Sequence, residues 1–248
     1  MALPAVSVVT VTHDGLFFSR LLVEKVRQFI GPRQYEIIVV DRGSHDGTRG
    51  WMANQSDVQL LKFSHIWTRG HGHAEAAGRA IKRAKFDRIV LLDSDAHPVS
   101  MSWLAESADK LDLCNRLAGA AEVDKHKGNP YGWYIHPHFM TFFRSDFDRL
   151  IVLRKMRGEE TDTGEMATIR VLEARLGIIK HQIIESKEFS VGIPGLPTVA
   201  GGVFHAWYVT RLLHDEPGVA RETDGQVTAA RYLVPMMKRL REAYHLDY

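Results

Sequence analysis

Short apolar runs alternate with amphipathic stretches through the first half of the chain. The apolar runs are rich in β-branched side chains, and each predicts a buried strand. They cover residues 5–12, 35–41, 58–63 and 88–93. Apolar side chains at helical spacing predict helices between these runs, at residues 19–30, 49–54 and 72–84. Strands and helices that alternate at such intervals predict right-handed βαβ units, and so an α/β fold with a mostly parallel sheet flanked by helices on both faces.

The second half of the chain has a less regular pattern. It predicts helices at residues 101–113, 165–176 and 227–244, and strands at residues 139–144 and 178–184. Residues 187–202 are rich in glycine and proline, which predicts a long loop. No internal repeat or interdomain linker interrupts the sequence, so we expect a single α/β domain with an elaborated C-terminal half.

Composition limits the class of protein. With 45% hydrophobic and 25% charged residues, the chain has the usage of an ordinary globular domain. A net charge of +2 argues against a wholly basic nucleic-acid-binding surface. The single cysteine, Cys114, excludes a disulfide scaffold and favours a reducing compartment. No apolar run approaches the roughly 20 residues of a membrane-spanning helix, and no secretory signal is recognisable, so we expect a cytoplasmic protein without a transmembrane segment.

Polar segments follow three of the predicted strands. They lie at residues 10–15, 41–48 and 93–95. Ligands of open parallel sheets bind beyond the carboxyl ends of the strands, so these three segments should line one crevice.

The third segment ends a buried strand with two carboxylates, Asp93 and Asp95, separated by Ser94. Carboxylates in such a place are costly unless something neutralises them. Mg²⁺ or Mn²⁺ would do so, because these ions prefer oxygen ligands and keep positions open for phosphate oxygens. Alternatively, the two residues cap a turn before Pro98, and the other two polar segments favour the metal.

The second segment begins with Asp41 at the end of a strand, where its carboxylate could accept a hydrogen bond from a nucleobase N–H. The glycines at positions 43 and 47 allow a tight turn, and Thr48 can cap the following helix. A plain strand-to-helix turn would explain Asp46 and Thr48 but leaves Asp41 unexplained.

Taken together, these segments resemble the inverting family 2 glycosyltransferases, which have the GT-A fold. The resemblance is carried by residues 6–14, 41–48, 72–80 and 88–95, together with Pro98. It implies that residues 1–115 form the nucleotide-sugar-binding half and residues 116–248 the acceptor-binding half of one GT-A domain. The sequence departs from the family at Arg42, where a second acidic residue is usual, which leaves the identity of the nucleobase open.

The resemblance also implies roles for individual residues. Donor contacts fall on Thr10, Val11, Thr12, Asp41, Gly72, Asp93, Ser94 and Arg211. Metal ligands fall on Asp93, Asp95 and His205. A histidine ligand shifts the expected ion from Mg²⁺ toward Mn²⁺. The alternative for His205 is a partly buried core histidine beside Trp207 and Tyr208.

An acidic stretch at residues 159–165 precedes a predicted helix and resembles the family's acidic segment beneath the acceptor. Inverting transfer needs one carboxylate to take the proton of the acceptor hydroxyl. We favour Asp162 as this base, with Glu160 and Glu165 as rivals. Acidic residues at a helix N-terminus also stabilise the helix dipole, which is the competing explanation.

The sequence therefore predicts a metal-dependent glycosyltransferase that moves a sugar from a nucleotide-diphosphate donor, a UDP-sugar first, to a hydroxyl acceptor with inversion. The alternatives are a nucleotidyltransferase or a non-catalytic nucleotide-sugar-binding protein. The acceptor could be a saccharide, a lipid carrier, a small molecule or a modified DNA base. Two further histidine pairs, at positions 71 and 73 and at positions 136 and 138, lack the partners of a closed zinc site, so we expect solvated or acceptor-pocket side chains.

Overall fold

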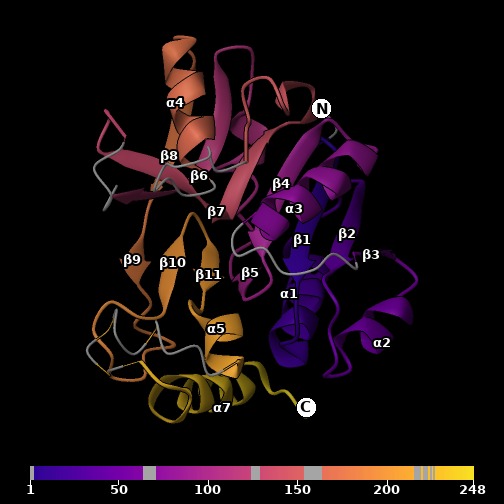
Figure 1. Cartoon of the computed structure of the whole chain (residues 1–248), viewed down its shortest axis with the longest axis vertical. Coiled ribbons are helices and arrows are strands. Elements are labelled where there is room, and N and C mark those ends of the chain that lie inside the picture. Colours follow the sequence, from indigo (N-terminus) through magenta and orange to yellow (C-terminus); the bar gives the residue numbers. More distant parts are fainter. Residues whose placement is uncertain are drawn as a thin grey trace.

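A seven-stranded sheet forms the centre of the molecule (Figure 1). The computed structural model describes residues 3–63, 71–123, 129–153, 164–214, 219, 223, 225 and 227–248. The sheet has the strand order β3-β2-β1-β4-β7-β6-β8. Its strands are β1 (Val6–Thr12), β2 (Tyr35–Asp41), β3 (Val58–Lys62), β4 (Arg88–Asp93), β6 (Asn115–Val123), β7 (Trp133–Phe143) and β8 (Gly177–Gln182). Neighbouring strands pair in parallel except β7, which is antiparallel to both β4 and β6. The predicted mostly parallel sheet is confirmed.

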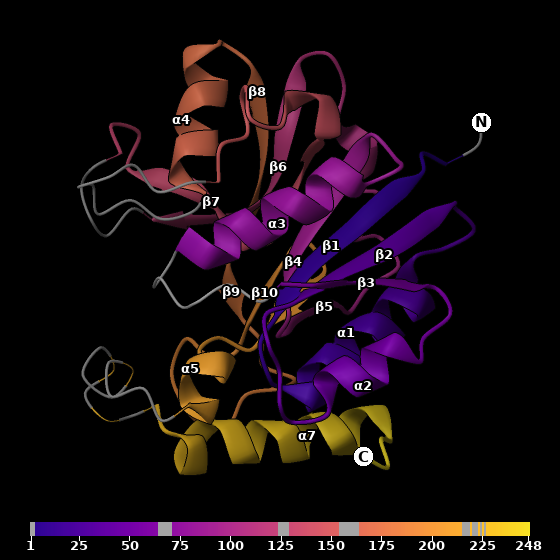
Figure 2. The same cartoon turned by 45° about the vertical axis from the view of Figure 1, so that its right-hand side comes forward.

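Helices cover both faces of this sheet, because its central strands are apolar on both sides. On β4, Ile89 and Leu91 face one core and Val90 and Leu92 the other. The first core is closed by α3 (His71–Arg83) and α4 (Glu165–Glu173), and the second by α1 (Leu16–Phe29) and α2 (Thr48–Ala53), as Figure 2 shows. Strands buried on both faces read as continuous apolar runs, which is why the sequence located β2 and β4 at their observed bounds.

A smaller antiparallel sheet with the order β5-β11-β10-β9 extends the molecule. Its strands are β5 (Ala96–Pro98), β9 (Ile184–Glu185), β10 (Thr198–Ala200) and β11 (Val203–His205). A third core joins this sheet to the C-terminal elements α5 (Val209–Leu213), the π-helical turn η3 (Ala229–Leu233) and α7 (Val234–Tyr244). The chain then returns to α1, where the Tyr248 hydroxyl donates a hydrogen bond to Glu24.

The strand register brings the three polar segments to one edge of the large sheet. Thr12 of β1 lies opposite Asp41 of β2, and Val11 lies opposite Asp93 of β4. The carboxyl ends of all three strands therefore meet, as the sequence predicted.

The helix predicted at residues 101–113 is wrong. The segment forms successive turns and the short 3₁₀ helix η1 (Ala108–Lys110). Serines in the segment and just before it bond locally and compete with helical bonding: Ser100 Oγ accepts from the N–H of Ser102, and Ser107 Oγ donates to the carbonyl of Trp103. Trp103 is fully buried and anchors the turns by donating its indole N–H to the Phe29 carbonyl.

Other bounds differ for physical reasons. Strand β6 was not predicted, since its alanines and glycine have weak strand preference and its neighbours supply the pairing. Strand β7 begins well before residue 139 and ends at the 3₁₀ turn η2 (Arg144–Asp146). The predicted loop at 187–202 contains β10. The predicted helix at 227–244 divides into η3 and α7 next to Pro235, which lacks an N–H for the helical ladder.

Among the described residues, no helix is both long enough and apolar enough to cross a bilayer.

Candidate active site

Two carboxylates and an imidazole converge at the carboxyl end of β4. Asp93 ends the strand, and Asp95 precedes β5. Pairing of β5 with β11 sets His205 opposite Ala96, so its ring reaches both acids. His205 Nε2 lies 3.2 Å from Asp95 Oδ1 and 3.9 Å from Asp93 Oδ2, and one ligand atom from each residue lies within 4.8 Å of the others. This is the spacing of ligands around a single cation.

Asp95 is held ionised in a nearly closed environment. Its residue exposure is 9%, and burial alone would raise the pKa of its carboxyl. The neighbouring His205 and the backbone N–H of Val209, at the start of α5, outweigh this effect and lower the pKa below its usual value. Asp93 is more open, with 23% of its side chain exposed, and its Oδ1 lies 3.6 Å from His73 Nε2 of α3. The two acids therefore form a site with one enclosed and one accessible carboxylate.

A column of aromatic rings continues from His205 into β7. His138 stacks on His205 with ring centroids 4.2 Å apart. The ring centroids of Trp207 and His205 are 4.4 Å apart. His136 Nδ1 accepts the backbone N–H of His138 and lies 2.8 Å from His138 Nδ1. Because His136 Nδ1 is an acceptor, His138 Nδ1 must be the donor. The proton of neutral His138 is therefore on Nδ1, and its Nε2 is an unprotonated acceptor.

His138 is a neutral imidazole. Its side chain is fully buried, and burial together with His205 and His136 lowers its pKa well below the usual value. Within the described residues its Nε2 atom has no hydrogen-bond partner. Of the two expectations for this histidine, a solvated or an acceptor-pocket side chain, the solvated one is wrong, because the antiparallel pairing of β7 with β4 carries His138 to the end of β4 and buries it.

Hydrogen bonds join the loop after β1 to the loop after β2 at the same edge of the sheet. The Asp14 N–H donates to Ser44 Oγ at 2.8 Å, and Asp14 Oδ1 accepts the His45 N–H at 2.7 Å. Asp46 accepts the N–H of Leu16 at 2.7 Å and so caps α1, which begins earlier than its apolar spacing indicated. The two loops thus form one rim at the carboxyl edge of the sheet.

Asp41 is engaged within its own turn. Its side chain is fully buried and accepts the N–H groups of Gly43 and Ser44, both at 3.2 Å, and Arg49 Nε at 2.6 Å. Burial would raise the pKa of this carboxyl, and the bonds from Ser44, Arg49 and Gly43 lower it to a net value below normal. Both carboxylate oxygens are therefore committed to holding the turn.

We expect Asp41→Asn to lower the free energy of unfolding by about 2–3 kcal/mol at pH 7, because it removes a buried acceptor of charged and backbone donors. A depressed native pKa contributes stability above the unfolded pKa, and that contribution is lost as pH falls through the native pKa. The difference between wild type and variant should hence shrink on acidification. Urea unfolding at pH 7 and at roughly pH 2, below the ordinary pKa of 3.8 for this carboxyl, measures it. Arg49→Gln serves as a milder control, since 39% of the Arg49 side chain is exposed. An equal difference at both pH values would contradict this account.

The remaining predicted donor contacts lie around the same edge. Thr10, Val11 and Thr12 are 1%, 5% and 1% exposed within β1, and the Thr12 hydroxyl bonds with Ser19 at 2.8 Å. Gly72 is close to Arg42: a Cβ at this glycine would lie 2.5 Å from the guanidinium. Ser94, which follows β4, and Arg211 of α5 are both half-buried. Their roles as donor contacts stay predictions.

Of the three base candidates, Glu165 is described and Asp162 and Glu160 lie outside the described residues. Glu165 begins α4 with 1% exposure. The preceding Gly164 touches β7 so closely that an added Cβ would lie 1.8 Å from the carbonyl oxygen of Ile135. Gly164 and Glu165, the described end of the acidic segment, therefore lie directly beside the strand that carries His136 and His138.

Comparison with protein families places this arrangement in a known group. The family model described as glycosyl transferase family 2 matches residues 7–172, which is most of the chain and includes β1 from its second residue, β2 and the Asp93–Asp95 segment. The chain belongs to glycosyl transferase family 2. It is thus a glycosyltransferase, and the predicted membership of this family is confirmed. A comparison with curated protein sequences finds no match.

Solved structures share the architecture of this family 2 glycosyltransferase. PcManGT, a mannosyltransferase from Pyrobaculum calidifontis in complex with GDP-Man and Mn²⁺, aligns with a TM-score of 0.53 at 19% identity, over 98% of this chain and 70% of its own. GalNAc-T7 with UDP, GalNAc and Mn²⁺ aligns with a TM-score of 0.51 at 14% identity, over 72% of this chain and 42% of its own. The likeness confirms the predicted GT-A fold.

The sequence predicted solvated or acceptor-pocket side chains for His73, His136 and His138 of this glycosyltransferase, and did not predict that they lie beside Asp93 and His205. A signal existed for the β7 pair, since side chains two positions apart on a strand point to the same face. The sequence did not predict the strand pairing that brings that face against His205, because β11 begins 60 residues after β7 ends and no local pattern links the two strands.

Proposed function

We propose that this family 2 enzyme is a metal-dependent inverting glycosyltransferase, with a nucleotide-diphospho-sugar as donor and a hydroxyl group as acceptor. The observation that supports it best is the convergence of Asp93, Asp95 and His205 at the carboxyl end of β4. Residues 1–115 would bind the nucleotide sugar and residues 116–248 the acceptor, with His205 and Arg211 reaching back to the donor.

The donor set fits a divalent cation. Two carboxylates supply hard oxygen ligands, one imidazole favours Mn²⁺ over Mg²⁺, and positions remain for phosphate oxygens. Asp95 and His205 would hold the ion, and the accessible Asp93 would share it or contact the ribose. When bound, the cation would offset the charge of the diphosphate and stabilise it as a leaving group.

Transfer with inversion would occur in a single displacement. The acceptor oxygen would form a bond to the anomeric carbon while the bond from that carbon to the diphosphate oxygen breaks, with the electron pair leaving on the nucleoside diphosphate. A carboxylate of the 159–165 segment, Asp162 first and then Glu160 or Glu165, would take the hydroxyl proton. The Arg211 guanidinium would stabilise the departing charge.

The nucleobase of the donor is proposed to be uracil, with guanine as the competing choice. The rim formed by the β1 and β2 loops would receive it. Because the Asp41 oxygens are engaged by the turn, the neighbouring Arg42, which reaches across to Gly72, is a candidate to read a base carbonyl.

A thermal-shift series with UDP, GDP and the corresponding diphospho-sugars, each with and without Mn²⁺, tests the proposal. A donor present at 100 times its Kd stabilises the folded state by about 2.7 kcal/mol, so the matching nucleotide should raise Tm measurably, and only when Mn²⁺ is present. Equal shifts with and without the ion would contradict metal dependence. Absence of a shift with every nucleotide would contradict the donor class.

A further inference from the structure

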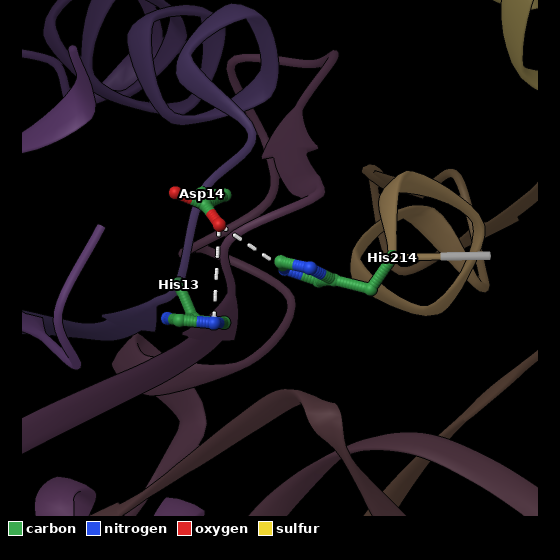
Figure 3. Close-up of side chains that lie close together, drawn as sticks. All are labelled: His13, Asp14 and His214. Carbon is green, nitrogen blue, oxygen red and sulfur yellow. Dashed lines mark ion pairs between the residues drawn. The ribbon is translucent and has the colours of Figure 1, made fainter. Parts of the chain in front are cut away.

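A second group of metal-ligating side chains lies at the rim, apart from Asp93, Asp95 and His205. It consists of His13 and Asp14, which follow β1, and His214, which caps the end of α5. Figure 3 shows both imidazoles reaching the same carboxylate. His214 Nε2 lies 3.1 Å and His13 Nε2 3.8 Å from Asp14 Oδ2, and one ligand atom from each residue lies within 4.8 Å of the other two.

Asp14 is fixed in the orientation that a ligand needs. Its backbone has φ = 57°, in the left-handed region, where an aspartate is better tolerated than most residues. Its N–H donates to Ser44 Oγ and its Oδ1 accepts the His45 N–H. These bonds occupy one carboxylate oxygen and direct the other, Oδ2, at the two imidazoles, as outer hydrogen bonds commonly orient metal ligands.

The spacing is close to that of a mononuclear site. Ligand atoms about 2.0–2.2 Å from one zinc ion lie roughly 3–3.6 Å apart. The distance from Asp14 Oδ2 to His214 Nε2, 3.1 Å, falls in this range, and the distance to His13 Nε2, 3.8 Å, lies just above it. The two rings are stacked, with centroids 4.9 Å apart at an interplanar angle of 18°, so both imidazoles lie on the same side of Asp14 Oδ2 with their Nε2 atoms within 3.8 Å of it. Side-chain exposures of 12%, 14% and 33% for His13, Asp14 and His214 leave access for the ion and for water ligands.

The donor chemistry differs from that of the acidic site at β4. Two imidazole nitrogens and one carboxylate oxygen favour Zn²⁺, Co²⁺, Ni²⁺ or Fe²⁺, whereas a site with two carboxylates suits Mn²⁺ and Mg²⁺. The two groups share no residue. We propose that His13, Asp14 and His214 form a second divalent-metal site, selective for Zn²⁺-type ions, that ties the loop after β1 to the end of α5.

An ion bound to His13, Asp14 and His214 would affect the proposed donor site by restricting the movement of α5. The first N–H of this helix, that of Val209, bonds to Asp95, and its last turn leads to His214. An ion held by His214 would fix α5 at both ends between the β1 loop and Asp95. The inference goes beyond the proposed transfer reaction, because ion binding here requires neither donor nor acceptor.

Co²⁺ binding tests the proposal directly, because coordinated Co²⁺ has a visible absorption that reports nitrogen and oxygen ligands. The comparison uses the wild type, His214→Gln, His13→Gln and Asp95→Ala, with His45→Gln as a matched control that removes an exposed histidine next to Asp14 and keeps its backbone N–H. We expect His214→Gln and His13→Gln to weaken one Co²⁺ site at least about 100-fold. Asp95→Ala and His45→Gln should retain that site, and Zn²⁺ should displace the Co²⁺.

Melting curves recorded without metal establish that each variant is folded, and two histidine variants keep the test valid if one of them fails to fold. Unchanged Co²⁺ affinity in both histidine variants would overturn the proposal. Loss of all Co²⁺ binding in Asp95→Ala would also overturn it, because the chain would then have only the acidic site. Neither result depends on transfer activity, so failure of this inference is distinguishable from failure of the proposed function.

Discussion

Asp95→Ala is expected to abolish Mn²⁺-dependent donor binding and to lower kcat/KM for sugar transfer by roughly 10³-fold or more. The reason is its position: Asp95 is the enclosed carboxylate of the acidic site, held ionised by His205 and the Val209 N–H. Its loss leaves Asp93 and His205 3.9 Å apart, without the third ligand that fixes the ion. Calorimetric titration of the donor with and without Mn²⁺, alongside initial rates, measures both effects.

The control for this variant is Asp148→Ala, which removes a surface carboxylate paired with Lys82 at 2.7 Å, where 46% of the aspartate side chain is exposed. It should leave donor binding and transfer unchanged. Circular dichroism should show that Asp95→Ala keeps the native secondary structure, since β4 and β5 are held by strand pairing and core contacts. Full transfer activity in Asp95→Ala would refute the metal assignment.

Asp162→Asn should lower kcat by about 10²–10⁴-fold and leave donor affinity nearly unchanged, because a general base acts on the acceptor proton and not on the nucleotide. The same measurement on Glu160→Gln and Glu165→Gln identifies the base among the three. The pH dependence of kcat should also be measured for these three variants. The variant that lacks the general base should lose the rise of kcat with pH that ionisation of that base produces.

Two outcomes would revise this assignment. An unaffected kcat in Asp162→Asn together with a large loss in one glutamine variant would move the base to that glutamate. Glu165 is buried at the start of α4, so a melting curve must accompany its variant to separate lost chemistry from lost packing. If all three variants keep kcat, the base lies outside this segment.

Several features of the fold were readable from local pattern. The apolar runs at 35–41 and 88–93 gave β2 and β4 at their observed bounds, because a strand buried on both faces needs apolar side chains throughout. The site edge was also readable, since parallel strands in βαβ units end at the same side of the sheet. The helix predicted at residues 101–113 failed where serine side chains and a buried Trp103 outweighed apolar spacing.

The sequence by itself determined the class of sheet, the position of the acidic pair and the resemblance to family 2, because each depends on residues close together in the chain. Only the tertiary structure decided which histidines meet. His138 reaches His205 through the pairing of β7 with β4 and of β11 with β5, and His214 reaches Asp14 across 200 positions. Contacts of that kind depend on strand register and on the packing of the C-terminal elements, and these are set by the whole core and not by any local run of residues.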